Sequence, residues 1–562
     1  MLMKLRRLII PLAIVAGLVL LLALGRGLVA SRVSLNLIEG GGQSIPTTLQ
    51  FVPKQSPLVV SVLARPDRLA DLWLHLARAK QRSVIQKELA WLEQVLLAPT
   101  GLSYQQDLQP WLGEEITAAL ISADIDQDPD NGLTPGYLVI FTCRQSQTAL
   151  ASLELFWQNQ ALGGAALTFS DRSGSRLISS SQAGLATTLV GDQFLLVANH
   201  PEVLRQALAS AQASDGNLEL DRRYKTALQA LPPQRVGLVA INLPGLKAWQ
   251  QGLSYPSGPV GLGAPDRPEV DWGLLSLALT RQGMVADLAF TATPGSVLKP
   301  WQGEDTPELK LVSYLSDFFP IIGVGRNLDL LTQTLRPLLD LLPPDWQSGL
   351  WGPQVIEANL GPETMARVEA GVDQAYGLGI TFGDRQGSSD WALISQPSPV
   401  WQRTLATLGE QAQAQGWGRS SLEIQQTPVR AWSRLAVEPG QTGLGVKAEV
   451  AALEADLGGY QLLTASPEGM NRLLKPKVSP GDGPAWLTEV KSWGSPAAAY
   501  LHLDWPPIQA QLQAQVPPFR LWEVGARPLL HHLQQITLAS YGQSDWLRTS
   551  RIFFQLANPH PG

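Results

Sequence analysis

Four aspartates that alternate along one stretch are the residues in this sequence best placed to do chemistry. Hard cations such as calcium need several carboxylate oxygens directed at one point, and alternating aspartates in a turn can supply them. The stretch departs from the EF-hand template, because Pro129 or Asn131 stands where the template has glycine. Two interpretations stay open: a calcium site, or a solvated hairpin tip kept soluble by its charge. The four residues are Asp124, Asp126, Asp128 and Asp130.

The other candidate catalytic groups lack the partners that catalysis needs. The sequence contains neither H-E-x-x-H nor a cysteine cluster, which excludes zinc sites of known spacing. Ser296 and Lys299 fit the S-x-x-K pattern, but Pro300 follows at once, so we interpret the match as a coincidence in a linker. Glu114 and Glu115 are neighbours in an expected strand and should face opposite sides, which argues against an acid–base pair. We therefore predict no enzyme activity and no cofactor other than calcium.

Two single residues of reactive type have structural interpretations. Cys143 ends an apolar strand, so we expect a packed thiol and not a nucleophile. It is the only cysteine, so no internal disulfide can form and stability must come from packing. His200 precedes Pro201 where a helix should begin, which favours a capping role over catalysis.

The elements that would position a site begin with an apolar run from Leu8 to Gly25. At about 1.5 Å per helical residue this run can span a bilayer core. Basic residues flank it, and the cationic side is usually retained in the cytoplasm. We predict a cytoplasmic tip and transmembrane anchor over residues 1–32, with the body in the periplasm or thylakoid lumen. A cleaved secretory signal is the first alternative, because Ala23-Leu24-Gly25 offers small residues at the spacing that signal peptidase prefers. A buried core helix of a cytosolic protein is the second.

Composition limits the partners of the body. Five basic residues precede Glu39, and without them 37 lysines and arginines face 48 acidic residues, a net charge of −11. This balance argues against nucleic acid, which requires a basic face. Hydrophobic residues make up 45% of the chain, so a large core can form. Of the 18 tryptophans, twelve lie from Trp301 onward, and aromatic side chains serve cores and interfaces.

The order of expected elements repeats along the chain. Gly191–Leu208 and Gly458–Lys475 both give an apolar strand, a small residue, and Pro-Glu at the start of a helix. We predict a spacer over residues 33–44, a first α+β repeat over 45–296, a junction over 297–307 and a second repeat over 308–558. Short connections favour mostly antiparallel sheets with helices on one face. We expect two similar sheets, each with its own apolar core.

Two sequence blocks carry a resemblance to a known family. They are FVPKQSPLVVSVLARPDRLADLW at Phe51–Trp73 and DLQPWLGEEITAAL at Asp107–Leu120. With the N-terminal apolar run, they make the chain resemble the mainly cyanobacterial, membrane-anchored proteins grouped as domain of unknown function 3352. The resemblance implies location and architecture over nearly the whole chain. It implies no activity and no catalytic residues.

Together these features predict a membrane-tethered, exported binding or scaffolding protein without catalytic activity. The Trp-rich second half and two Pro/Gly-rich loops, Tyr255–Pro268 and Pro517–Pro528, are the expected surfaces for a protein partner. A carrier of lipid or another apolar ligand is the first alternative, and an exported hydrolase of unrecognised type is the second. A large apolar pocket would favour the carrier, and a cluster of titratable groups in a cleft would favour the enzyme.

Overall fold

The computed structural model describes most of the body of the chain. The described residues are 37, 41–42, 45–69, 103–126, 133–172, 174–250, 269–280, 282–298, 301, 309–316, 318–339, 362–382, 389–440, 443–475, 484–493, 497–515, 519, 523, 530 and 532–556. Among them no helix is both long enough and apolar enough to cross a membrane. The predicted anchor Leu8–Gly25 lies outside the described residues.

All the strands of the described residues belong to one antiparallel sheet of 20 strands. The first ten are β1 (Leu58–Val62), β2 (Leu112–Ser122), β3 (Gly136–Cys143), β4 (Thr168–Arg172), β5 (Ser175–Ser180), β6 (Leu185–Val190), β7 (Phe194–Ala198), β8 (Gly237–Asn242), β9 (Val270–Leu279) and β10 (Gly283–Ala292). The second ten are β11 (Ile321–Arg326), β12 (Ala375–Phe382), β13 (Ser389–Ser395), β14 (Gly418–Ile424), β15 (Thr427–Gly440), β16 (Gly443–Leu457), β17 (Tyr460–Thr464), β18 (Ala499–Asp504), β19 (Leu533–Gln543) and β20 (Leu547–Leu556).

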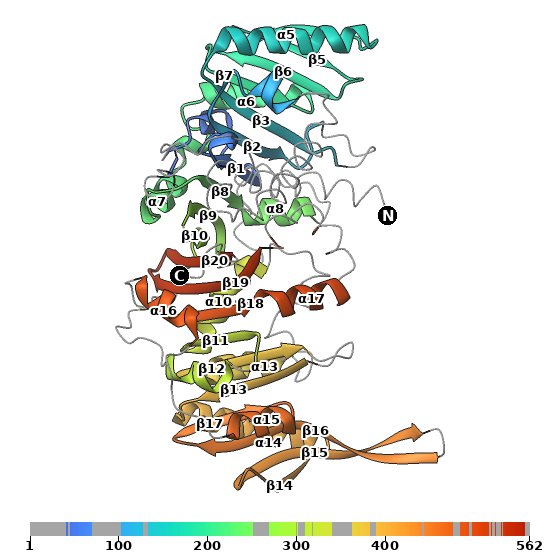
Figure 1. Ribbon diagram of the computed structural model, residues 1–562, viewed down its shortest axis with the longest axis vertical. Helices are drawn as coiled ribbons and strands as arrows, with labels where there is room; N and C mark the ends of the chain where they lie inside the picture. Colours follow the sequence, from blue (N-terminus) through green and yellow to red (C-terminus); the bar gives the residue numbers. More distant parts are fainter. Residues whose placement is uncertain are drawn as a thin grey trace, which may run out of the picture.

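The strand order of the first ten strands is repeated by the second ten. From one edge to the middle the order is β4-β5-β6-β7-β3-β2-β1-β8-β9-β10. From the other edge to the middle it is β14-β15-β16-β17-β13-β12-β11-β18-β19-β20. The strands β7 (Phe194–Ala198) and β17 (Tyr460–Thr464) therefore hold equivalent places. The sequence pattern predicts this equivalence for Phe194–Ala198 and Gln461–Ala465, so the second strand begins and ends one residue earlier than predicted. Figure 1 shows the strands stacked along the long axis of the molecule.

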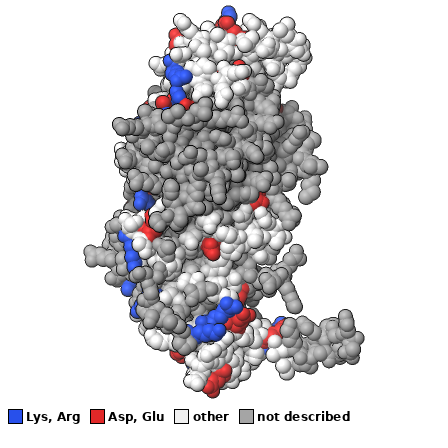
Figure 2. Space-filling model, in the orientation of Figure 1, with Lys and Arg blue, Asp and Glu red and all other residues white. Residues whose placement is uncertain are grey.

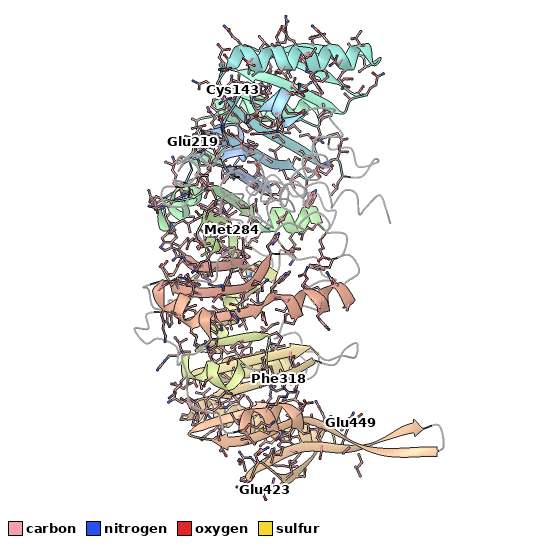
Figure 3. The ribbon with its side chains drawn as sticks, viewed as in Figure 1. Cys143, Glu219, Met284, Phe318, Glu423 and Glu449 are labelled. Carbon is pink, nitrogen blue, oxygen red and sulfur yellow. The ribbon has the colours of Figure 1, made fainter. Side chains whose placement is uncertain are left out.

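The expectation of two separate sheets is wrong, because β10 and β20 pair with each other. Their register runs from Gly283 opposite Gln555 to Thr291 opposite Leu547, so the last strands of the two series join edge to edge. At the centre of this pairing Asp287 lies opposite Arg551. Figure 3 labels Met284 of β10 near the middle of the molecule, between Cys143 in one half and Glu423 in the other.

Helices cover both faces of the sheet, so the prediction of helices on one face is wrong. The strand β1 explains why: its residues Val59 to Val62 are all buried, with successive side chains on opposite faces. One face packs against α5 (Ser146–Leu162), α8 (Leu243–Gln250), α10 (Leu328–Leu339), α13 (Pro362–Gly371), α14 (Pro399–Ala414) and α17 (Trp505–Gln515). The other packs against α6 (Pro201–Gln212), α7 (Arg222–Ala230), α9 (Val312–Leu315), α15 (Pro467–Leu474) and α16 (Ala485–Ser492).

Short helices complete the described elements. They are η1 (Thr48–Phe51), η3 (Tyr104–Leu108), η4 (Leu218–Leu220) and η5 (Leu309–Leu311). The helices α6 and α15 present Leu204 with Leu208, and Met470 with Leu474, to the same relative face of the sheet, as predicted. The hairpin of β15 and β16 extends beyond its neighbouring strands and projects from one end of the molecule (Figure 1).

Candidate functional site

The predicted calcium loop lies only partly within the described residues. Asp124 Oδ1 accepts a hydrogen bond from the backbone N–H of Thr134 at 3.2 Å, so this carboxylate helps to close the loop. Asp128 and Asp130 lie outside the described residues. Among the side chains that the structure does describe, no three acidic, histidine or cysteine groups converge in a way that would hold a metal ion. The calcium site remains a prediction.

Glu114 and Glu115 face opposite sides of β2, as their adjacency predicts. Glu114 is exposed and forms an ion pair with Arg68 at 2.9 Å. Glu115 is fully buried and accepts hydrogen bonds from the backbone N–H groups of Thr47 and Thr48 at 2.8 and 3.0 Å. Its carboxylate also accepts from the hydroxyls of both threonines. It therefore anchors the first turn of η1 to the sheet.

Two reactive side chains singled out in the sequence, Cys143 and His200, lie where they serve packing or helix capping. Burial raises the pKa of Cys143 to about 11, which keeps the thiol protonated and unreactive at neutral pH. His200 caps α6, and its Nδ1 accepts from the N–H of Glu202 at 3.2 Å. Lys299 lies outside the described residues, as do the loop Tyr255–Pro268 and all of Pro517–Pro528 except Phe519 and Glu523.

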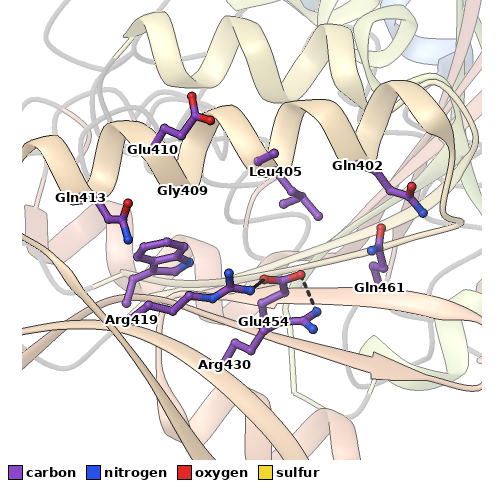
Figure 4. Close-up of a pocket in the computed structure, with 11 residues that line it drawn as sticks. Gln402, Leu405, Gly409, Glu410, Gln413, Arg419, Arg430, Glu454 and Gln461 are labelled. Carbon is purple, nitrogen blue, oxygen red and sulfur yellow. Dashed lines mark hydrogen bonds and ion pairs between the residues drawn. The ribbon is translucent and has the colours of Figure 1, made fainter.

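A polar cleft of about 370 Å³ lies between α14 and the strands at one end of the sheet (Figure 4). The helix contributes Gln402, Leu405, Ala406, Gly409, Glu410 and Gln413. The strands contribute Arg419 from β14, Arg430 and Trp432 from β15, Glu454 from β16 and Gln461 from β17. The helical residues lie three or four apart along one side of α14, which is why a single helix can roof the cleft.

Two arginines and one carboxylate organise the floor of this cleft. Arg430 lies directly opposite Glu454 in the sheet, and the guanidinium and carboxylate are 2.6 Å apart. Arg430 also contacts Asp456 at 3.3 Å, and its pKa is raised by the hydrogen bond to Glu454. Arg419 lies 4.0 Å from Glu454 on the other side. The side chain of Glu454 is only 12% exposed, so it is a carboxylate held between two cations.

Trp432 forms an apolar wall beside these charges. A Cβ atom at position 409 would come within 2.9 Å of its ring, so only glycine lets the helix approach the indole this closely. The guanidinium of Arg419 lies over the ring at 5.5 Å from its centroid. These contacts hold the indole between α14 and β14.

Two buried polar atoms of the lining residues have no hydrogen-bond partner within the described part of the chain. They are Nε of Arg430 and Oε1 of Gln461. An unpaired buried polar group costs about 1–3 kcal/mol. Two such atoms among the lining residues of one cleft favour a site whose hydrogen bonds are completed by a bound molecule or water.

The first half of the sheet has apolar or neutral side chains where this cleft has charged ones. Leu195 of β7 and Gln461 of β17 are equivalent positions, because each lies six residues before the proline that begins the next helix. Following the strand registers outward from these two residues makes Ile178 equivalent to Arg430, and Thr187 equivalent to Glu454. There Trp157 of α5 is buried and donates its indole N–H to Thr187 at 2.8 Å. The charged cleft is therefore a specific feature of the second half.

Sequence reasoning missed this cleft. A signal was present, since Arg430 and Trp432, and Glu454 and Asp456, alternate along strands whose inward side would otherwise be apolar. Over the face drawn in Figure 2, charged side chains of both signs are scattered among uncharged ones. The overall charge of the sequence gives no sign of the cleft, because the positive and negative side chains that line it cancel.

Comparisons with known proteins identify a family and little more. The family described as "Protein of unknown function (DUF3352)" matches residues 12–556. No curated protein matches the sequence. Crystal forms I, IV and III of TP0453 are similar at 8%, 10% and 11% identity, with TM-scores of 0.24, 0.24 and 0.25. They cover 45%, 43% and 45% of this chain and 82%, 79% and 83% of their own. At these TM-scores the likeness supports no conclusion.

Proposed function

This chain belongs to the DUF3352 family of proteins of unknown function, and on that premise we propose that it is a non-catalytic binding protein with a polar ligand site under α14. The observation that carries the proposal is the cleft in which Arg430, Glu454 and Gln461 replace the less polar side chains of the first half. Partly unpaired polar atoms at its floor are a cost to folding that ligand binding would offset. A polar lining supports a polar ligand in preference to the lipid that a carrier would hold.

Binding without catalysis is supported by the chemistry of the lining residues. Glu454 lies between two guanidinium groups, 2.6 Å from that of Arg430 and 4.0 Å from that of Arg419, so its carboxylate is already engaged in ion pairs within the floor of the cleft. The lining residues include no serine, cysteine, histidine or lysine that could serve as an activated nucleophile. The sequence also predicts a scaffold for a protein partner, and a protein with this cleft could serve as one.

The body is proposed to be tethered to a membrane and exported. The support is the uncharged run Leu8–Gly25 with basic residues before and after it. The N-terminus would be cytoplasmic and the body periplasmic or in a thylakoid lumen. A reporter that is active only in the cytoplasm, fused after Gly562, should stay silent; strong activity would contradict the export of the body.

The body is also proposed to have arisen by tandem duplication, with repeats over 45–296 and 308–558. The repeated strand order supports this origin, because unrelated β-α alternation would not fix which strands pair. The charged cleft would then be a later specialisation of one repeat.

The binding proposal is tested by giving the cleft the side chains of the first half. The triple variant Arg430→Ile, Glu454→Thr, Gln461→Leu should fold, because replacing a partly buried ion pair by apolar groups is often neutral or stabilising. Thermal melting of the full chain in nanodiscs is measured with neutral sugars, amino acids and small carboxylates. At least one class should raise the melting temperature of the parent and leave the variant unchanged, since a ligand stabilises the state it binds. Equal responses of both proteins would refute the proposal.

A further inference from the structure

We infer that the ligand of the cleft under α14 is a neutral sugar unit. This inference rests on the proposed function and adds the chemical class of the ligand. It is carried by three properties of the cleft: balanced charge, a mixture of hydrogen-bond donors and acceptors, and apolar walls beside them.

The charges that line the cleft cancel. Arg419 and Arg430 contribute two positive charges, and Glu410 and Glu454 contribute two negative ones. Arg430 is already engaged by Glu454 at 2.6 Å and by Asp456 at 3.3 Å. An anion would meet carboxylates and a cation would meet guanidinium groups, so neither gains the net attraction that a site for a charged ligand provides.

The hydrogen-bonding groups suit hydroxyls, which both donate and accept. Gln402, Gln413 and Gln461 each carry an amide with two donors and an acceptor. Oε1 of Gln461 is buried without a partner among the described residues, so it can accept from a ligand hydroxyl. Nε of Arg430 is likewise unpaired and donates only. Sugar hydroxyls can supply both kinds of partner, because each hydroxyl donates one hydrogen bond and accepts others.

Apolar surface lies next to these polar groups. Trp432 of β15 and Leu405 of α14 both line the cleft, one from the sheet and one from the helix. A sugar ring has C–H faces between its hydroxyl edges, and such faces pack on aromatic and aliphatic side chains. The cleft volume of about 370 Å³ is at the lower end for small-molecule sites, which suits one sugar unit with water.

The test is saturation-transfer NMR on the full chain in nanodiscs, prepared without glycoside detergent. The neutral probes are D-glucose, D-galactose and sucrose, and the probes with ionised groups are glutamate, which is a net anion, and glycine betaine, which is a zwitterion. At least one sugar should give a saturable signal. In Gln461→Leu that signal should be about tenfold weaker, because one hydrogen bond to the ligand is lost and the buried acceptor is removed.

A matched control separates the cleft from the rest of β15. Arg434 pairs with Glu449 at 2.8 Å and does not line the cleft, so Arg434→Gln should leave sugar binding unchanged. Gln461→Leu carries the residue of the equivalent first-half position, and its melting temperature should stay within a few degrees of the parent. Weakened binding in a variant that melts normally supports the site.

The outcomes distinguish the two proposals. Binding of glutamate or betaine that Gln461→Leu abolishes, with no sugar signal, overturns the sugar inference and leaves the polar binding function standing. Sugar signals of equal strength in parent and Gln461→Leu overturn the assignment to this cleft. If no probe of either class binds, both proposals fail.

Discussion

At the scale of single residues, Glu115 shows how a buried carboxylate can be structural. It is fully buried, and two backbone N–H groups and two hydroxyls of Thr47 and Thr48 donate to it. The hydroxyl of Thr48 also contacts that of Thr117 at 2.6 Å, which itself lies 2.7 Å from Ser61 Oγ. The network ties the start of the described body to β1 and β2 without exposing a charge to solvent.

Removing this carboxylate should destabilise the fold strongly. Glu115→Ala leaves two backbone N–H groups without their acceptor, so we expect the free energy of unfolding to fall by about 2–4 kcal/mol in urea titrations. The neighbouring substitution Glu114→Ala removes only an exposed ion pair with Arg68 and should cost at most about 1 kcal/mol. Equal effects of the two substitutions would contradict the anchoring role of Glu115.

His502 should make stability depend on pH. Its ring stacks on Trp486 at 4.5 Å between ring centroids, its Nδ1 lies 3.0 Å from Thr537 Oγ1, and burial lowers its pKa to about 4. The folded state therefore favours neutral histidine, whereas an unfolded histidine titrates near pH 6.5. Stability is complete above about pH 6.5 and falls as the pH drops toward about 4, because the unfolded state then binds the additional proton.

The contribution of His502 can be isolated by substitution. Between pH 7 and pH 4.5 the parent should lose about 2–3 kcal/mol more unfolding free energy than His502→Asn, which cannot titrate in this range. Chemical denaturation of both proteins at the two pH values measures the difference. Parallel losses in parent and variant would show that other groups account for the acid sensitivity.

At the scale of elements, local patterns predicted much of the fold. The helices α6 and α15 both begin at Pro-Glu, and their side-chain caps His200 and Ser466 precede them in the sequence. In the segment that forms β14, β15 and β16 the signal is weaker, because it consists only of the alternation of Arg430 with Trp432 and of Glu454 with Asp456. Strands of 14 and 15 residues are far longer than the usual 5–6, and charged side chains occupy positions that face α14. The cleft was missed for the same reason.

The outer part of the β15–β16 hairpin should be dispensable for folding. Beyond Ser433, β15 pairs only with β16 within the described residues, and exposed Leu435 has no cover there. Replacing residues 435–448 by Asn-Gly would close the hairpin at the register pair Arg434 and Glu449 with a two-residue turn. We expect the melting temperature to change by only a few degrees.

A substitution in the inner part of the same strand provides the contrast. Val429 is fully buried between β14 and β16, so Val429→Ala should lower the free energy of unfolding by about 1–3 kcal/mol. A large loss of stability on excising residues 435–448, comparable with that of Val429→Ala or greater, would show that the projecting part takes part in the core.

At the scale of the whole molecule, the sequence predicted that the order of elements recurs, but not that the strands form one continuous sheet. Repeated elements can be recognised locally, whereas the pairing of β10 with β20 joins residues that are far apart in the chain. Apolar residues alternate in the same way in an edge strand and in a central strand. The sequence pattern therefore cannot show that the edge strands β10 and β20 pair with each other. The join replaces two exposed edges, which are sites of unwanted strand pairing, by one interior ladder.

The ion pair at the centre of this join should be energetically coupled. Asp287 and Arg551 lie opposite each other with Oδ1 and Nε 2.7 Å apart, and their side chains are only 12% and 25% exposed. Leaving either charge without its partner in this half-buried position is costly. In a double-mutant cycle with Asp287→Asn and Arg551→Gln, we expect a coupling energy of about 1–3 kcal/mol in the free energy of unfolding.

An exposed pair of similar geometry gives the reference for that cycle. Lys54 and Asp215 are 3.0 Å apart, but their side chains are 38% and 76% exposed. Water screens this pair, so Lys54→Gln and Asp215→Asn should couple by less than about 0.5 kcal/mol. A larger coupling energy for Asp287 and Arg551 than for Lys54 and Asp215 would mean that burial, and not the distance between the charges, determines the strength of the pair. The buried pair would then help to hold the two halves of the sheet in register. Coupling energies of the same size would instead leave the backbone ladder and the apolar side chains of β10 and β20 as the source of that register.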